Sequence, residues 1–114
     1  MNIEEQRLLS VIGLCAKAGK LIFGTDRICE ELRISKCPPL AVVEASGNSA
    51  NTSKRLKDRC AYYGIAHYVI GSDALALGYA VGKKKPVAAV GITDRGLLEA
   101  VLRKLPAENN GNIR

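Results

Sequence analysis

The sequence is poor in the residues that stack on bases and in those that carry catalysis. It contains no tryptophan, one phenylalanine and four tyrosines, which leaves few stacking platforms for single-stranded nucleic acid. The single histidine, His67, has no obvious cysteine, serine or carboxylate partner, so we interpret it as a structural residue. No acid–base pair or activated nucleophile is recognisable, which argues against an enzyme. We expect half-buried packing roles for Tyr62, Tyr63, Tyr68 and Tyr79.

Signatures of metals and cofactors are also missing. The cysteines show no C-x-x-C spacing, so we expect neither a zinc site nor a disulfide framework, and we expect them to be reduced and mostly buried. No G-x-G-x-x-G occurs, and residues 13–20 differ from the phosphate loop of nucleotide hydrolases. Their spacing is one residue too long, and Leu21 replaces the hydroxyl that holds magnesium. The sequence therefore predicts no cofactor, no metal and no catalytic residue.

No apolar run approaches the ~20 residues that span a bilayer. The first residues, Met1 to Gln6, are acidic where a signal peptide would be basic. We therefore expect a cytoplasmic protein that makes no membrane contact.

Length and charge indicate the number of domains and the kind of ligand. The 114 residues, of which 47% are hydrophobic, suffice for one domain with its own core. Seventeen Lys and Arg against eleven Asp and Glu give a net charge of +6, which attracts polyanions. We expect a single monomeric domain over residues 1–105 and a flexible tail over residues 106–114, which are rich in Asn and Gly.

Hydrophobic periodicity predicts alternating helices and strands. Helical spacing predicts a first helix over residues 4–17, a second that begins at residues 24–26 and ends before Pro38, a third after the polar loop at residues 46–52 with Leu56, Cys60 and Tyr63 on its inner side, a fourth over residues 74–79 and a fifth over residues 94–105. Short apolar runs at residues 21–23, 40–44, 67–70 and 87–92 predict strands. This alternation predicts an α/β fold, namely a three-layer α/β/α sandwich around a small mixed sheet of about four strands.

The segment from Gly13 to Leu32 is the most informative for function. A basic turn with Lys17, Gly19 and Lys20 leads into a short strand, and a helix then begins at residues 24–26, Gly-Thr-Asp. Helix N-termini offer free backbone amides, and glycines let another backbone approach closely. Cations and amides in one small area favour an anionic polymer, and we infer RNA.

Three segments carry a resemblance to a known family. They are G-T-D-R-I-C-E-E-L-R, A-S-G-N-S-A-N-T-S-K-R-L-K-D-R-C-A-Y-Y-G-I and L-G-Y-A-V-G-K-K-K-P-V-A-A-V-G-I-T-D. From Leu8 to Leu105 the chain resembles the ribosomal kink-turn-binding superfamily of the L7Ae and L30e type, and most of all its small bacterial YlxQ-type members. The resemblance implies the same α/β/α fold, a stand-alone RNA-binding protein, and ribosomal or translation-related RNA, with the ribosome as a partner.

In that family the RNA surface combines the start of the second helix with the loop before the last strand. The family's helix motif usually reads Gly-Ala/Thr-Asn-Glu-Val-Thr-Lys, whereas this chain has Asp26, Arg27 and Glu30 where Asn, Glu and Lys read the G·A pairs of the kink. The loop carries three lysines, which add phosphate affinity without adding sequence information. We expect RNA binding with altered specificity. The expected RNA-binding residues are Lys17, Lys20, Gly24, Thr25, Asp26, Arg27, Glu30, Lys83, Lys84 and Lys85.

Two other functions stay open at this point. The chain could be a protein-interaction module that docks on a ribosomal or transcription component through its basic face. The basic helix face from Lys54 to Arg59 is most simply a solvated surface, with direct contact to nucleic acid as the alternative. It could also be a small-molecule enzyme that uses the turns at Gly19 and Gly24 as a phosphate cradle, although catalytic groups are missing. Arg27 and Glu30 could simply form a surface ion pair three residues apart.

Overall fold

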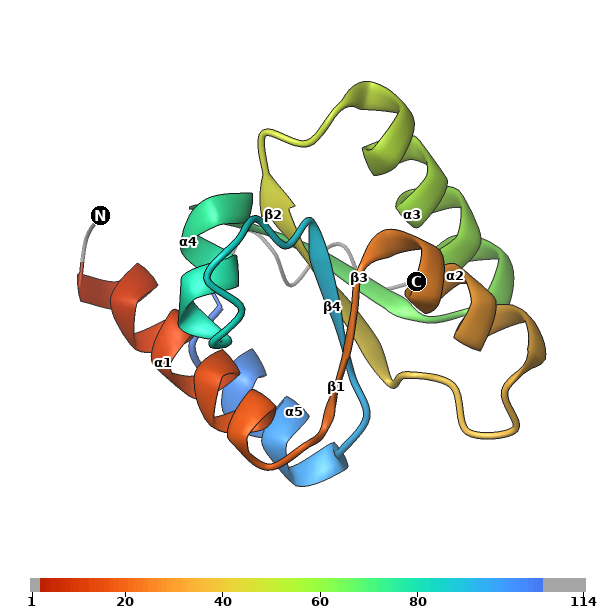
Figure 1. Cartoon of the computed structure of the whole chain (residues 1–114). Helices are drawn as coiled ribbons and strands as arrows, with labels where there is room; N and C mark the ends of the chain where they lie inside the picture. Colours follow the sequence, from red (N-terminus) through yellow and green to blue (C-terminus); the bar gives the residue numbers. More distant parts are fainter. Residues whose placement is uncertain (1–2, 106–114) are drawn as a thin grey trace.

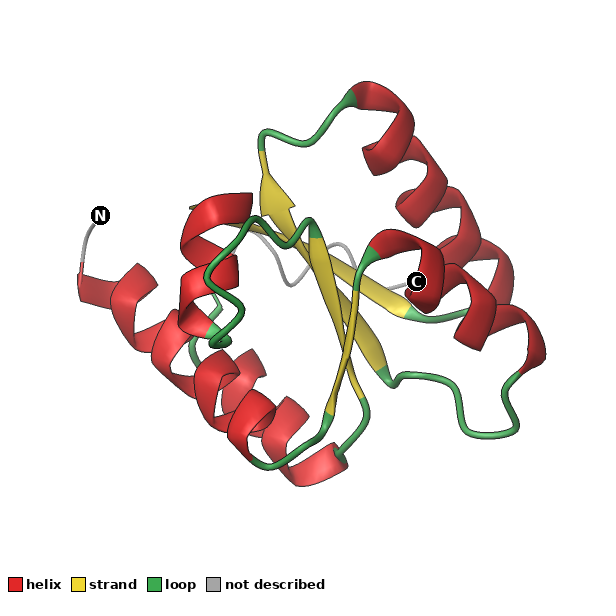
Figure 2. Cartoon of the chain, viewed as in Figure 1, coloured by secondary structure: helices red, strands yellow, loops and turns green. Residues whose placement is uncertain are grey.

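The computed structural model describes residues 3–105 as one α/β fold (Figures 1 and 2). Helices and strands alternate in the predicted order. The predicted tail, residues 106–114, lies outside the described residues. The elements are α1 (Ile3–Lys17), β1 (Leu21–Phe23), α2 (Thr25–Ile34), β2 (Ala41–Ser46), α3 (Ala50–Tyr63), β3 (Ala66–Asp73), α4 (Ala74–Ala80), β4 (Ala89–Ile92) and α5 (Arg95–Leu102).

Three layers make up the molecule, with the sheet in the middle. The four strands lie in the order β1-β4-β2-β3, and only β2 and β3 run parallel. Helices α1, α4 and α5 cover one face, and α2 and α3 cover the other (Figure 1). The predicted three-layer sandwich with a mixed sheet is therefore confirmed.

Each face of the sheet has its own apolar cluster. The periodic residues of α1, such as Leu8 and Ile12, pack with Val43 and Val90 on the larger side. On the other side, Leu56 of α3 packs among residues of α2, β1, β2 and β4. This pattern explains why the buried strands read as nearly continuous apolar runs.

The strand register gathers several helix starts at one edge of the sheet. Because β1 and β4 are antiparallel and Phe23 pairs with Val90, the end of β1 lies beside the beginning of β4. β2 is also antiparallel to β4, and Glu44 pairs with Ala89 there. The starts of α2, α3 and α4 and the loop that enters β4 consequently share this edge, which we call the functional edge (Figure 1).

Two strands differ in length from the sequence-based expectation. β3 continues past Ile70 to Asp73, because its pairing with β2 resumes after a register shift. In this added part, Glu5 accepts hydrogen bonds from Ser72 N and Oγ at 2.9 and 2.6 Å. β4 begins later than expected, at Ala89. The reason is that the N–H of Val87 donates to the carbonyl of Ala74 in α4 at 2.9 Å, and not to a neighbouring strand.

A buried carboxylate organises the functional edge from inside. Glu44 is 1% exposed and accepts hydrogen bonds from Ser53 Oγ of α3 and, at 3.2 Å, from Asn48 Nδ2. His67 Nε2 lies 2.8 Å from Glu44 Oε1. The expectation that His67 has no carboxylate partner is therefore wrong. The partner is 23 residues away in sequence and becomes adjacent only through parallel pairing of β2 and β3.

The expectation that the cysteines are mostly buried is confirmed. Cys15, Cys29 and Cys60 are buried and Cys37 is exposed. Burial raises the pKa of Cys60 to about 12, so this thiol stays protonated near neutral pH and behaves as a small apolar residue.

The loop between α4 and β4 packs unusually close to α4. Gly78 is buried in α4, and a Cβ at this position would lie 1.6 Å from the carbonyl oxygen of Lys85. The carbonyl of Gly78 also accepts a hydrogen bond from Lys83 N at 2.9 Å. Only glycine at position 78 therefore allows the observed path of this loop, which carries Lys83, Lys84 and Lys85 and is called the lysine loop below.

Replacing Glu44 by Ala should lower the free energy of unfolding by about 3 kcal/mol or more, because His67, Ser53 and Asn48 lose a buried acceptor. Urea unfolding followed by circular dichroism measures the change. Glu99→Ala, at an exposed position of α5, is the control and should change the stability by less than about 0.5 kcal/mol. Equal midpoints for Glu44→Ala and the wild type would contradict this account of the cluster.

The substitution Gly78→Ala should displace the lysine loop and cost about 1–3 kcal/mol, because the new methyl group collides with backbone. Amide chemical shifts of Lys83, Lys84, Lys85 and Val87 should move in a nitrogen–proton correlation spectrum. Gly96→Ala is the matched control, since its nearest neighbour would be Asp94 Oδ2 at an ordinary 3.5 Å. If the loop signals of Gly78→Ala do not shift, the close contact between Gly78 and Lys85 does not determine the path of the loop.

Candidate nucleic-acid interface

The start of α2 is an uncapped helix N-terminus. Gly24 precedes it with φ 92° and ψ 147°, and no side chain accepts from the first-turn amides. In contrast, Ser49, Asp73 and Asp94 cap α3, α4 and α5 through their side chains. The first-turn amides of α2 are thus available to an external acceptor.

Gly24 itself is fixed by the sheet. Its N–H donates to the carbonyl of Ala89 at 3.2 Å. A Cβ on Gly24 would meet nothing within 4 Å, but its positive φ disfavours any other residue. The glycine therefore leaves open space in front of the helix start, where a ligand backbone can approach.

The lysine loop lies against this helix start. The ammonium of Lys83 lies 4.3 Å from the centroid of the Phe23 ring. Phe23 is the residue that precedes Gly24 in the sequence. Lys84 has a positive φ of 57°, and all three lysines are exposed. The structure thus brings Lys83 of this loop to Phe23, directly before Gly24 and Thr25, a proximity of the two elements that sequence reasoning had expected from the resemblance alone.

The two other predicted lysines have different positions. Lys17, the last residue of α1, lines one surface hollow together with Phe23 and Lys83. Lys20 lies at the opposite end of β1, where its carbonyl accepts hydrogen bonds from both the N–H and the hydroxyl of Thr93 at 3.0 Å. Lys17 therefore joins the functional edge, whereas Lys20 does not.

The charged residues at the head of α2 all have ionic partners. Arg55 Nη1 of α3 contacts Asp26 Oδ1 at 2.6 Å, and this hydrogen bond raises the pKa of Arg55. Arg27 pairs with Glu31 at 3.4 Å. In addition, Glu30 accepts from Arg33 at 3.1 Å.

These ion pairs correct one interpretation and add a residue. The pair between Arg27 and Glu30 is not formed, because each finds a better placed partner on α2. Arg55 was considered only as part of the α3 face, yet it reaches the head of α2. Only the packing of α2 against α3 could reveal that contact, since its residues are 29 positions apart.

Three of the four tyrosines do not have the expected half-buried environment. Tyr62 is 81% exposed and Tyr79 is 60% exposed, whereas Tyr68 is fully buried. Tyr62 comes two positions after the buried Cys60 and so falls on the outer side of α3. Tyr79 follows the buried Leu77 and Gly78 of α4 in the same way. The expectation of half-buried packing is confirmed for Tyr63 and wrong for Tyr62, Tyr68 and Tyr79, and Tyr62 and Tyr79 leave exposed aromatic surface.

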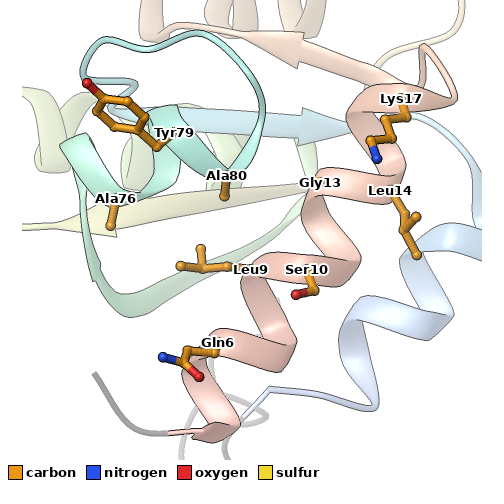
Figure 3. A pocket seen from close by; sticks show the side chains of 9 residues that line it. All are labelled: Gln6, Leu9, Ser10, Gly13, Leu14, Lys17, Ala76, Tyr79 and Ala80. Carbon is orange, nitrogen blue, oxygen red and sulfur yellow. The ribbon is translucent and has the colours of Figure 1, made fainter.

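A shallow apolar groove runs between α1 and α4 (Figure 3). Its volume is about 760 Å³. It adjoins the smaller hollow of about 430 Å³ next to Lys83, and Gly13, Lys17, Tyr79 and Ala80 line both. The groove therefore leads directly to the functional edge.

Other kinds of site find no support in the part of the chain that the structure describes. Within residues 3–105, no three His, Cys, Asp or Glu side chains are grouped to hold a metal ion. Among the helices of the same residues, none is long and apolar enough to cross a membrane.

Comparisons with known proteins identify relatives of this chain. RNA-binding protein YlxQ of Bacillus subtilis (strain 168) is 30% identical over 95 residues, which cover 83% of this chain and 91% of the relative. RNA-binding protein YlxQ of Enterococcus faecium is 34% identical over 93 residues, covering 82% and 85%.

Solved structures with the same fold are known as well. A Bacillus halodurans protein of unknown function superimposes with a TM-score of 0.75 at 28% identity, over 86% of this chain and 95% of its own. The Giardia lamblia 15.5kD RNA binding protein shares the fold with a TM-score of 0.75 at 16% identity, over 99% and 92%. The model of the ribosomal protein L7Ae/L30e/S12e/Gadd45 family matches residues 6–102. The resemblance seen in the sequence is thereby confirmed, and the chain belongs to the ribosomal protein L7Ae/L30e/S12e/Gadd45 family.

Proposed function

We propose that this protein binds structured RNA at the functional edge, through the uncapped start of α2 and the lysine loop at residues 83–85. The observation that carries the proposal is the contact of Lys83 with Phe23, which joins the two elements into one surface. Open helix amides and three exposed lysines suit phosphate oxygens. The two curated relatives are named as RNA-binding proteins, which supports a binding protein and not an enzyme.

Phosphate contacts supply the affinity in this proposal. The acidic and basic side chains at the head of α2 are locally compensated, but the lysines of the loop have no acidic partner among the ion pairs of residues 3–105. Uncompensated cations release counterions from RNA when they bind, and this makes affinity salt-dependent. We expect log K to fall against log salt with a slope of about −3 to −5, corresponding to about four to six neutralised phosphates.

Specificity for a kink-turn is the finer part of the proposal. Asp26 cannot donate through its side chain, Arg27 cannot accept, and Glu30 repels phosphate. The ion pairs with Arg55, Glu31 and Arg33 add a further cost, because an RNA base edge must compete with them. We therefore propose a weak preference for kinked over unkinked RNA. Ribosomal or translation-related RNA, a monomeric state and action in the cytoplasm or on the ribosome belong to the same proposal.

A second candidate is docking on a protein through the outer face of α3. The exposed Tyr62 stands at 85° to Tyr63, with ring centroids 4.9 Å apart, on a helix rich in Lys and Arg. Aromatic and Arg residues are enriched where proteins bind each other. The lysine-loop variant below separates the two candidates, since it leaves α3 untouched.

Replacing Lys83, Lys84 and Lys85 together by Ala should weaken binding to every RNA alike and reduce the magnitude of the salt slope by about two to three. The probes are a kink-turn hairpin and a fully paired hairpin of equal length, titrated by fluorescence anisotropy over a range of salt. The fold should persist, because the three side chains are exposed.

The matched control removes the same charge elsewhere. Lys36, Arg103 and Lys104 are exposed and lie outside the functional edge, so their replacement by Ala should leave the slope nearly unchanged. If the lysine-loop variant binds RNA like the wild type, the RNA site must lie elsewhere, and the outer face of α3 is the next candidate. Absence of RNA binding by the wild type at low salt would refute the proposed function.

The head of α2 should limit discrimination between the two hairpins. We expect the wild type to prefer the kink-turn by less than about tenfold, or roughly 1.4 kcal/mol. The triple variant Asp26→Asn, Arg27→Glu and Glu30→Lys should raise this ratio, since a good base-edge contact is worth about 1–3 kcal/mol.

Both hairpins are titrated with both proteins at one salt concentration. Arg55→Ala is an informative companion, because it releases Asp26 without changing the head of α2. It should not reproduce the gain in discrimination. A wild-type preference of about a hundredfold or more would show that Asp26, Arg27 and Glu30 read the kink in another way.

A further inference from the structure

A hollow of about 430 Å³ opens where α1, β1 and the loop after α4 meet. Its floor exists because α1 and α4 approach closely at Gly13, where a Cβ would lie 2.7 Å from the carbonyl oxygen of Ala80. The volume falls within the roughly 300–1,000 Å³ of small-molecule sites. The hollow is therefore large enough for a flat ring with its attached groups.

The lining combines aromatic rings with cations. Tyr79 and Phe23 line the hollow, and Tyr79 is 60% exposed. Lys17 and Lys83 line the hollow as well, and the contact of the Lys83 ammonium with the Phe23 ring holds one charge in place. A site lined by an exposed tyrosine and two cations has the chemistry that unpaired nucleotides need, because the base stacks on a ring and the phosphate meets the ammonium groups.

The hollow adjoins two other surfaces along which an RNA strand can run. Lys83 belongs both to the hollow and to the loop that forms the proposed RNA surface. On the other side the hollow continues into the groove between α1 and α4, where Ser10 and Gln6 offer polar groups beside apolar ones (Figure 3). A strand that leaves the structured RNA at the functional edge can therefore follow this path.

From this geometry we propose that the hollow binds an unpaired nucleotide of a single-stranded extension of the RNA, with its base stacked on Tyr79 and its phosphate held by Lys17 and Lys83. The inference rests on the proposed function, because the structured part of the same RNA occupies the functional edge. It assigns to Tyr79 a role that the two RNA-contacting elements of the family resemblance do not include.

Extended and blunt RNAs test the proposal. The probes are the blunt kink-turn hairpin and the same hairpin with a run of about six uridines at its 5′ or its 3′ end. One of the two extensions should tighten binding by about 5- to 100-fold over the blunt hairpin, which is the range of one stacked base. Tyr79→Ala should abolish this gain and leave the blunt hairpin unaffected, whereas Tyr79→Phe should keep most of it.

Tyr62→Ala is the matched control. It removes an even more exposed tyrosine, on α3, and should preserve the gain. A wild type that binds extended and blunt hairpins equally, or a gain that survives Tyr79→Ala, would overturn the proposal. A protein partner would then be the better occupant of the hollow.

A second measurement separates this inference from the proposed function. A short oligouridylate without any hairpin is added to the labelled protein, and amide chemical shifts are followed at Gly13, Ala80 and Gly82. Shifts centred there support the nucleotide site even if the protein binds neither hairpin, a result that would refute only the proposed function. Unchanged signals at these three residues up to millimolar oligouridylate would overturn the inference even if both hairpins bind.

Discussion

The antiparallel pairing of β1 with β4 is the constraint on which the candidate site depends. A strand of only three residues, β1, pairs Phe23 with Val90 and thereby sets the end of β1 beside the start of β4. The helix start that follows β1 and the loop that precedes β4 must then meet, although they are about 60 residues apart in sequence. The hydrogen bond from Gly24 to Ala89 and the contact of Lys83 with Phe23 are consequences of this register.

Two glycines and one buried carboxylate turn that topology into a defined surface. Gly78 lets the backbone of Lys85 rest on α4, and Gly24 supplies the positive φ between β1 and α2. Behind the surface, Glu44 ties β2 to β3 and α3 through His67 and Ser53. Packed and fully hydrogen-bonded supports hold a binding surface in one geometry, which lowers the entropy lost on binding.

Hydrophobic periodicity was sufficient to predict the order of the elements, because it is a local pattern in the sequence. The buried stripe of α1 is an example of such a local signal. The partner of His67 and the bond between Asp26 and Arg55 join residues 23 and 29 positions apart, so they depend on strand register and helix packing. The exposure of Tyr79 was missed because α4 has only seven residues, too few for a helical stripe to be recognised.

Charge is distributed over the functional edge in two different ways, and this separates affinity from specificity. At the head of α2 each charged side chain has an intramolecular partner, so the net field there is small and an RNA group gains contact only by displacing a partner. In the lysine loop, Lys83 is held by an aromatic ring instead of a carboxylate and keeps its full charge for the ligand. In the function we propose, such a surface attracts RNA through the loop and leaves selection to RNA shape and to any base that reaches an exposed ring.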